Sequence, residues 1–445
     1  MLLIVGPPTS NASVLLQALT SPSDLPISST SELDYGLLPP STVQRPSFFR
    51  RSPKDAGLLR SQIVYMGEHD VHFATLSLRS SMMPGSLAKA PSLRARLDGS
   101  SRKQWAESRL GKLVDAVGLS HAMGTKVGSP LVRGLSGGER KRASIVEALL
   151  TRASVLCLDA PTSGLDSSTA LSLLSFLKKW AKDGKRSLVA TSPAISDPLY
   201  QQFDKVLVLN STGHQIFFGR TEDAQSYFDK LGLGFHRRVE TGEGTVEFIV
   251  SCNEGRGNDV ELEKAWLKSS ARKKLQSEMK EYEQEYPYDK TAAPLIAALK
   301  EEKSRATTAH YTTSFLYQVA ILTRRQYALI ASELPSYVTK TIVNLLLSVT
   351  VGSLFYRLPT TSSGAFTRGS LLLLAIMFNA YLSLAELGKA IEGRDIVRRQ
   401  GDWGFFGSSA LALARVAGDL PLIGAQCLLF GTVTYFMAGL QVSHL

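Results

Sequence analysis

The sequence predicts a protein of two parts: an α/β domain with a largely parallel sheet, followed by an all-α transmembrane segment of about three helices. Two observations support this prediction. Residues 1–334 carry 76 charged side chains, whereas the 111 residues 335–445 carry only 13, which indicates a change of solvent from water to lipid. Short apolar runs alternate with helical stretches through the first 250 residues, a pattern typical of an α/β domain.

The overall composition excludes several classes of protein. With 44% apolar residues in a chain of 445, disorder throughout is excluded. The three cysteines, Cys157, Cys252 and Cys427, are too few and too scattered for a disulfide framework or a C-x-x-C metal site. Residues 1–20 lack a basic segment followed by a long apolar stretch, so we do not expect them to form a secretory signal. Membrane insertion is therefore expected from internal segments.

Three regions follow one another along the chain. Residues 1–250 form the α/β domain, 251–310 a charged connector and 311–445 a partial transmembrane domain. The connector holds 11 acidic and 11 basic side chains with few apolar ones, so we expect solvated helical stretches and no core. The strands of the first region are expected at Leu2–Val5, Ile63–Met66, 154–159, Ser187–Thr191 and 206–210.

Three charge-poor windows, at about 335–357, 369–388 and 420–440, are candidate membrane spans. Each has about 20 residues, which at about 1.5 Å per residue crosses a hydrocarbon core of about 30 Å. Lys340 lies near one end of the first window and can snorkel. Buried core helices of a soluble domain are the alternative, but they would make that domain unusually poor in charge.

Basic side chains predict which way the spans are oriented. The segment between the second and third spans carries Lys389, Arg394, Arg398 and Arg399, so the positive-inside rule places it in the cytoplasm together with the large N-terminal part. Residues 357–368 then lie outside. Residues 312–327 have helical apolar periodicity, which suits a helix at the membrane interface or on the surface of the α/β domain.

The strongest local motif is LSGGERKR at residues 135–142. Ser136 and Glu139 have the spacing of a capping box, so a helix is expected to begin here. The adjacent Gly137 and Gly138 leave backbone N–H groups bare at the positive end of that helix. The motif therefore predicts a phosphate-binding helix terminus.

A second motif follows within about twenty residues: an apolar strand ends at Asp159, and a turn with Gly164 and Asp166 precedes the next helix. A carboxylate at the carboxyl end of a parallel strand can hold Mg²⁺. The pair of motifs closely resembles the signature, Walker B and D-loop of ATP-binding cassette (ABC) proteins. This resemblance implies a P-loop-type ABC nucleotide-binding domain that binds ATP and Mg²⁺.

The phosphate loop of that family is expected directly after the first strand, where the chain reads GPPTSNAS. Gly6 and Ser13 match, but Asn11 replaces the second glycine and Ala12 the lysine. Because the lysine ammonium contacts the β- and γ-phosphates, ATP binding is expected to be weakened. The resemblance assigns Gly6, Ser10 and Ser13 to nucleotide binding, and Ser13 with Asp159 to the metal.

The remaining family positions are also substituted. Glu68 stands where the Q-loop glutamine is expected, and the neighbouring His69 and His72 are interpreted as packing or surface residues, not metal ligands. Ala160 replaces the Walker B glutamate and Pro193 the switch histidine. By this resemblance, the nucleotide-binding domain of this chain is expected to lack hydrolytic residues of its own.

An intact signature beside broken Walker motifs suits a composite site. ABC cassettes pair head to tail, so Ser136, Gly137, Gly138 and Asp166 are expected to complete the ATP site of a second ABC half, in the same longer chain or in another subunit. A non-hydrolysing remnant with a scaffold or regulatory role is the alternative.

The membrane part resembles the G subfamily, and most closely its fungal pleiotropic drug resistance group, through 352–356 (GSLFY), 364–369 (GAFTRG) and Asp419-Leu420-Pro421. The resemblance implies ATP-driven export of amphipathic xenobiotics or lipids by a multi-pass protein of the plasma membrane. It also implies an incomplete chain, because family members have an adenine-stacking region before the first strand, six spans and a second cassette.

Two sets of charged residues remain to be interpreted. Glu386, Arg415 and Asp419 lie in or beside spans, and the last two are expected to pair along one helix or to contact substrate. The basic residues between 79 and 109 are interpreted as a solvated loop, so no nucleic-acid partner is expected. They are Arg79, Lys89, Arg94, Arg96, Arg102, Lys103 and Arg109.

Overall fold

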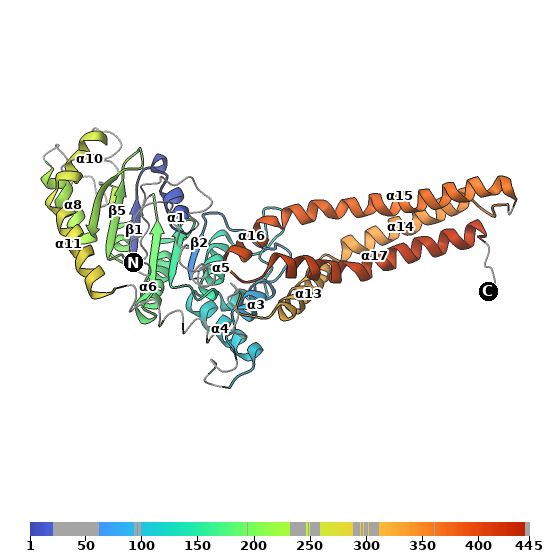
Figure 1. Cartoon of the computed structure of the whole chain (residues 1–445), viewed down its shortest axis with the longest axis horizontal. Helices are drawn as coiled ribbons and strands as arrows, with labels where there is room; N and C mark the ends of the chain where they lie inside the picture. The colour runs from blue at the N-terminus through green and yellow to red at the C-terminus, as the bar shows by residue number, and fades with distance from the viewer. Residues whose placement is uncertain are drawn as a thin grey trace.

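The computed structural model describes residues 1–20, 62–92, 96, 99–193, 195–231, 246–247, 249, 259–287, 294, 297, 301, 311–359 and 361–440. The α/β domain lies at one end, and the long helices Leu334–Leu354, Ser362–Glu392 and Ser408–Ala438 project from it to the other end (Figure 1). The predicted fold class is confirmed: an α/β domain comes first and an all-α segment follows.

The sheet of the α/β domain has the strand order β2-β3-β4-β1-β5-β6. The first five strands in this order are parallel, and β6 is antiparallel to β5 at the edge. All five predicted strands form within one residue of their expected bounds, while β6 was not predicted. The strands are β1 Leu2–Val5, β2 Ile63–Met66, β3 Val155–Asp159, β4 Ser187–Thr191, β5 Lys205–Leu209 and β6 Gln215–Arg220.

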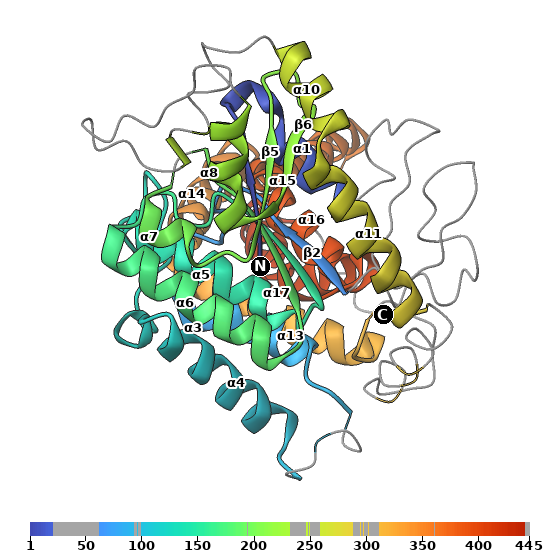
Figure 2. The ribbon, with the colours of Figure 1, turned by 90° about the vertical axis from the view of Figure 1, so that its left-hand side faces the viewer.

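Both faces of the sheet are buried, because helices cover each of them. Along β1, Leu3 and Val5 join the large core cluster beneath α5 and α6, whereas Ile4 points to the opposite face and packs near Leu16 of α1. Figure 2 shows α5 and α6 on one side of the strands and α1 and α11 on the other. Burial on both faces therefore fixes the carboxyl ends of the central strands, and with them the starting points of the loops that follow.

The helices of the first 250 residues fall between the strands or after them. They are α1 Ala12–Thr20, α3 Leu78–Ala88, α4 Arg102–Ala116, α5 Gly137–Leu150, α6 Ser167–Asp183, α7 Asp197–Tyr200 and α8 Thr221–Lys230.

The stretch expected to be a solvated connector contributes two helices, α10 Asp259–Lys268 and α11 Ser270–Glu285. The expectation that it adds nothing to the core is wrong for α10. Its Trp266 is 2% exposed, with its ring centroid 5.7 Å from that of Phe217 on β6. Together with Leu262, which is 1% exposed, this large aromatic side chain anchors α10 to the core.

The C-terminal segment consists of α13 Phe315–Ser332, α14 Leu334–Leu354, α15 Ser362–Glu392, α16 Arg394–Asp402 and α17 Ser408–Ala438. Within the part of the chain that the structure describes, two helices, α14 and α17, are long and apolar enough to cross a membrane. The predicted second span lies inside α15, and the side chains of 382–387, including Glu386, lie outside the described residues. A third span stays a prediction.

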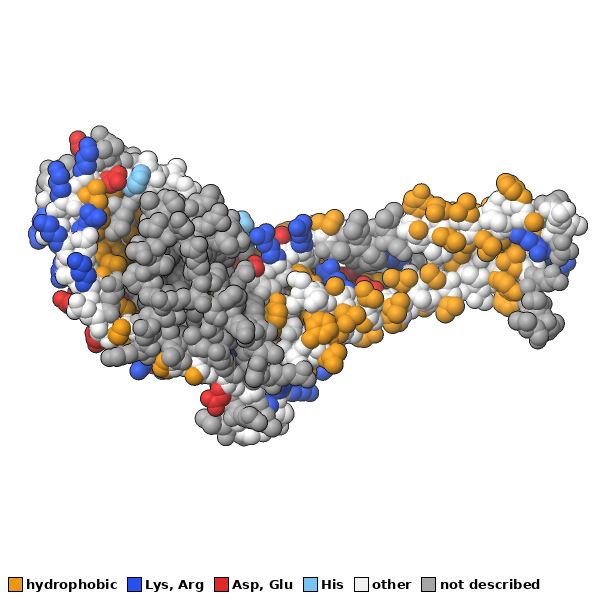
Figure 3. Space-filling view, viewed as in Figure 1, with side chains coloured by type: hydrophobic (Ala, Val, Ile, Leu, Met, Phe, Trp, Pro, Cys, Tyr) orange, Lys and Arg blue, Asp and Glu red, His pale blue; other side chains and the backbone are white. Residues whose placement is uncertain are grey.

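The projecting helices expose apolar side chains along their length, which appear as orange patches in Figure 3. Leu346 of α14 is 62% exposed, Ile376 of α15 is 64% exposed and Leu428 of α17 is 72% exposed. Soluble proteins rarely expose such a contiguous apolar surface, which suits contact with lipid.

Helix α13 lies at the junction of the two parts, where its Ile321 and Leu322 enter the core of the α/β domain. It also packs on α17, and the expected Arg415–Asp419 pair is not formed there. Instead, the Gln326 amide of α13 donates to Asp419 Oδ1 at 2.9 Å. The tertiary partner prevails because Gly418 lets α13 approach closely: a Cβ at Gly418 would lie 2.4 Å from Gln326 Cγ.

Candidate functional site

The predicted phosphate loop folds as a tight turn between β1 and α1. Pro8–Ser10 form one turn of 3₁₀ helix, Asn11 is left-handed with φ 55°, and α1 begins at Ala12. A Cβ on Gly6 would lie 2.5 Å from Ser10 Oγ, so this position requires glycine. Gly6 and the buried Ser10 therefore shape the loop.

The structure brings together the hydroxyl of Ser13 and the carboxylate of Asp159, the two residues that the resemblance assigns to the metal, although 146 residues separate them. Ser13 Oγ donates to Asp159 Oδ1 at 2.9 Å. Two further hydroxyls donate to the same carboxylate: Tyr65 to Oδ2 at 3.0 Å and Thr191 to Oδ1 at 2.5 Å. Tyr65 has its pKa raised, chiefly by burial and then by the charge of Asp159, so it stays a neutral donor.

Ser13, Glu68 and Asp159 line one cavity of about 470 Å³. This volume is in the range of sites for nucleotide-sized ligands. The signature residues Ser136–Gly138 and Asp166 are not among the described residues that line it. The lining residues are Ser13, Gln17, Thr20, Ile63, Tyr65, Gly67, Glu68, His69, Val71, Asp159, Asp395, Arg398, Arg399, Asp402 and Trp403.

The predicted capping box of the signature forms in full at the start of α5. Ser136 Oγ accepts from the N–H of Glu139 at 3.2 Å, and Glu139 Oε2 accepts from the N–H of Ser136 at 2.8 Å. The pKa of Glu139 is lowered, first by this bond to the Ser136 backbone and next by His121. Ser136 and Gly137 are exposed, and a Cβ on Gly137 would meet no atom within 4 Å. The helix terminus is thus open to a ligand.

Asp166 serves as the N-cap of α6 in this structure. Its carboxylate accepts from the Thr169 N–H at 3.0 Å and from the Ser168 hydroxyl at 2.5 Å. These bonds lower the pKa of Asp166. The turn before it lies against the signature, because a Cβ on Gly138 would lie 3.0 Å from Leu165 Cδ2.

Ala160 and Pro193, which replace the hydrolytic residues of the family, lie just after the ends of β3 and β4. Ala160 follows β3 with φ 45°, and its N–H donates to Thr191 Oγ1 at 3.1 Å. Pro193 is exposed just beyond β4. Neither side chain can take or orient a proton, so the structure supplies no general base at these two positions.

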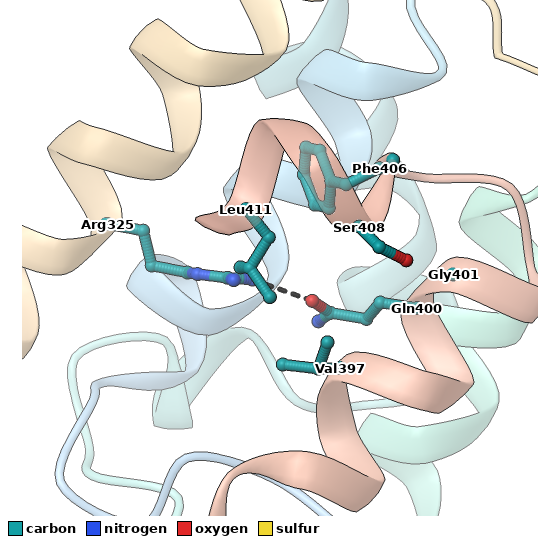
Figure 4. Close-up of a pocket in the computed structure, with 8 residues that line it drawn as sticks. Arg325, Val397, Gln400, Gly401, Phe406, Ser408 and Leu411 are labelled. Carbon is teal, nitrogen blue, oxygen red and sulfur yellow. Dashed lines mark hydrogen bonds between the residues drawn. The ribbon is translucent and has the colours of Figure 1, made fainter. Parts of the chain in front are cut away.

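A buried polar network joins the α/β domain to the C-terminal helices, and sequence reasoning did not find it. Its centre is Glu147 of α5, which is 1% exposed. Arg399 of α16 donates to Glu147 Oε2 at 2.5 Å, and the Gln400 amide donates to Oε1 at 2.9 Å. Gln400 Oε1 in turn accepts from Arg325 of α13 at 2.6 Å (Figure 4).

Aromatic rings and a neutral histidine complete this network. The Arg325 guanidinium lies 5.0 Å from the ring centroid of Phe73 and 5.6 Å from that of Phe406, and burial lowers its pKa to about 10. His72 is buried and donates to or accepts from Ser144 at 2.8 Å; burial and then Arg399 lower its pKa well below 6.5. His72 is therefore a packing residue, as predicted.

The Q-loop is held against α5 by Lys141 of the signature helix. The Lys141 ammonium donates to the carbonyl of Glu68 at 2.5 Å and lies 3.6 Å from Asp70. The Trp403 indole N–H, just after α16, donates to the Tyr65 carbonyl at 2.9 Å. The predicted basic segment is thus a short helix on the α/β-domain side of the long helices, next to the site.

Comparison with known proteins agrees with both halves. Residues 2–163 match the family described as ABC transporter, and residues 317–445 match the family described as ABC-2 type transporter. The chain therefore combines an ABC nucleotide-binding domain, referred to below as the cassette, with an ABC-2 type membrane domain. The predicted resemblance to ABC transporters is confirmed at this level.

The relatives that match the whole chain include members of the G family. The chain is 32% identical over 452 residues to ABC transporter G family member 21 of Dictyostelium discoideum, a match that covers 99% of this chain and 30% of the relative. It is 31% identical to ABC-type transporter eriD of Hericium erinaceus and 31% identical to ABC multidrug transporter I of Aspergillus fumigatus, each over 99% of this chain and 30% of the relative. The chain thus spans under a third of the length of these relatives.

A solved structure, cbiO1 from Clostridium perfringens, part of the ABC transporter complex cbiONQ, aligns with 54% of this chain and 84% of its own length, with a TM-score of 0.37 and 20% identity.

Proposed function

We propose that the chain is the non-hydrolysing half of an ATP-driven exporter and that it donates its signature to the ATP site of a second ABC half. One observation carries this proposal: the signature Ser136-Gly137-Gly138 forms an intact helix terminus at which Ser136 and Gly137 are exposed, whereas Ala12, Ala160 and Pro193 stand where the catalytic groups of the chain's own site are expected. The second half supplies the lysine and the glutamate.

The cassette's own Walker site fits a weakly held nucleotide. Ser13 Oγ and Asp159 Oδ1 lie 2.9 Å apart. Hydroxyl and carboxylate oxygens are the kind of ligand that Mg²⁺ prefers. Bound Mg²⁺ supplies positive charge for the β- and γ-phosphates. Because Tyr65 and Thr191 already donate to Asp159, metal binding has to compete with these hydroxyls. Ala12 adds no charge, so the affinity is lower than with lysine.

Coupling to the membrane domain is proposed to pass through Glu147. The Glu147 carboxylate accepts hydrogen bonds from Arg399 and Gln400 of α16. Lys141, which lies on α5 like Glu147, binds the Q-loop carbonyl of Glu68. A shift of the signature helix on closing around ATP therefore displaces α16, and with it α15 and α17 on either side.

The transported compounds are proposed to be amphipathic xenobiotics or lipids, and the site of action the plasma membrane with the cassette in the cytoplasm. The resemblance to the pleiotropic drug resistance group and the similarity to a relative named as a multidrug transporter support the substrate class. The basic helix α16 beside the cassette supports the orientation.

The composite site is tested by Ser136→Arg in the chain reconstituted with a cassette protein that carries the Walker lysine and glutamate. We expect the ATPase activity of the pair to fall by about a hundredfold, because the arginine blocks the helix terminus. Ser101→Arg is the matched control, since Ser101 forms the equivalent capping box with Gln104 on α4, away from the signature. Unchanged ATPase activity in Ser136→Arg contradicts the proposal.

The presence of Ala12, Ala160 and Pro193 at the positions of the family lysine, glutamate and histidine also favours a second candidate, a scaffold or regulatory protein that binds a complete transporter without sharing its ATP site. The same reconstitution separates the two. A scaffold co-purifies with the transporter, but Ser136→Arg leaves the ATPase activity of the pair unchanged.

A further inference from the structure

Helix α16 of the membrane domain lines the same cavity as two Walker residues of the cassette, whereas Gly6 and Ser10 of the phosphate loop are not among the described residues that line it. Ser13 and Asp159 stand on one part of its wall, and Asp395, Arg398 and Asp402 of α16 stand on another. A ligand that fills these 470 Å³ therefore touches both domains at once.

The two arginines of the cavity wall, Arg398 and Arg399, differ in the contacts that their guanidinium groups make. Arg399 donates to Glu147 and to the Val71 carbonyl, and it stacks 5.0 Å from the Trp403 ring centroid. Arg398 is exposed and has no hydrogen bond, ion pair or ring contact within the part of the chain that the structure describes. Its charge is therefore available to a ligand in the cavity.

The phosphate loop lacks a cation because Ala12 stands at the lysine position. An arginine suits the same task, since its planar fork binds two phosphate oxygens at once. We propose that Arg398 of α16 binds the phosphates of a nucleotide in this cavity and replaces the missing lysine from across the domain boundary. This inference rests on the proposed nucleotide binding by the cassette's own Walker site.

The other charges of the wall are consistent with a magnesium nucleotide. Glu68 and Asp159 lie on the cassette side, where the metal is expected. Asp395 and Asp402 lie about one helical turn on either side of Arg398, where they reduce its positive potential. The cavity is therefore expected to bind the nucleotide weakly. Its affinity for the nucleotide depends on Arg398 more than it would in a cassette that keeps the phosphate-loop lysine.

The test is a titration of the full chain in lipid nanodiscs with a fluorescent N-methylanthraniloyl derivative of ATP and Mg²⁺. Arg398→Ala is expected to weaken binding by about tenfold, the effect of one charge-assisted contact. Arg394→Ala is the matched control, because Arg394 is exposed on the same helix but does not line the cavity. Arg398→Lys keeps the charge and is expected to keep most of the affinity.

Restoring the family lysine provides an independent readout. If both cations serve the same phosphates, Ala12→Lys recovers the affinity lost in Arg398→Ala. Equal binding by Arg398→Ala and the unmodified chain overturns the role of Arg398 and leaves the nucleotide site standing. No binding by the unmodified chain overturns the proposed nucleotide site itself, and the role of Arg398 with it.

Discussion

Glu147→Ala is expected to lower the midpoint of thermal unfolding of the purified chain by on the order of 10 °C and to uncouple α16 from the cassette. The carboxylate is 1% exposed and is the shared acceptor of Arg399 and Gln400. Its removal leaves a half-buried guanidinium without its counter-charge, which typically costs about 3–5 kcal/mol. Fluorescence-monitored melting measures the first effect, and hydrogen exchange of the α16 amides the second.

Glu107→Ala is the matched control for Glu147→Ala. Glu107 also pairs with an arginine, Arg79, at 3.0 Å, but this pair lies at the surface, where the expected cost is about 0–1 kcal/mol. Adding Arg399→Ala to Glu147→Ala should recover part of the loss, because no unpaired charge remains. Equal melting shifts for Glu147→Ala and Glu107→Ala would contradict the central place of Glu147.

Gly137→Ala is expected to lower the ATPase activity of the reconstituted pair by about a hundredfold without loss of folding. In the chain itself the added methyl group meets no atom within 4 Å, and alanine in a helix is favoured over glycine by about 0.5–1 kcal/mol. In the proposed composite site, the methyl group stands where the nucleotide of the second ABC half would approach the helix terminus. The stability of the fold is therefore expected to increase slightly, while access of the nucleotide to the proposed composite site is blocked.

Gly111→Ala provides the control for this substitution. Gly111 is also helical, on α4, and its added Cβ likewise meets no atom within 4 Å. It should give a similar melting temperature and unchanged ATPase activity. A pair that hydrolyses ATP normally with Gly137→Ala would show that no phosphate lies against this terminus.

The elements that could be predicted from the sequence are those set by local rules. The strand bounds follow from short apolar runs, and the capping box of α5 follows from the spacing of Ser136 and Glu139. The assignment of Ser13 and Asp159 to one site came from the family resemblance, and their contact agrees with the rule that parallel strands place their carboxyl ends at one edge.

The network around Glu147 could not be predicted in this way. Its bond to Arg399 joins residues 252 positions apart, and a glutamate inside SIVEALL looks like any polar residue of an amphipathic helix. A local rule was also misleading at Asp419, where the i, i+4 spacing suggests Arg415 but Gln326 of α13 lies nearer. In both cases the packing of distant helices, absent from local patterns, decides the partner.

The most direct test of the account is a cross-link between the signature of this chain and the phosphate loop of its partner. Ser136→Cys is close to isosteric, and it is combined with Cys252→Ser and Cys427→Ser. Cys427 is exposed, whereas the remaining Cys157 is buried. With a cysteine in the partner's Walker A loop, we expect a cross-link that forms with ATP and is lost when the partner's Walker lysine is replaced. A cross-link that fails to form with ATP in an actively hydrolysing pair would contradict the donor role of this half.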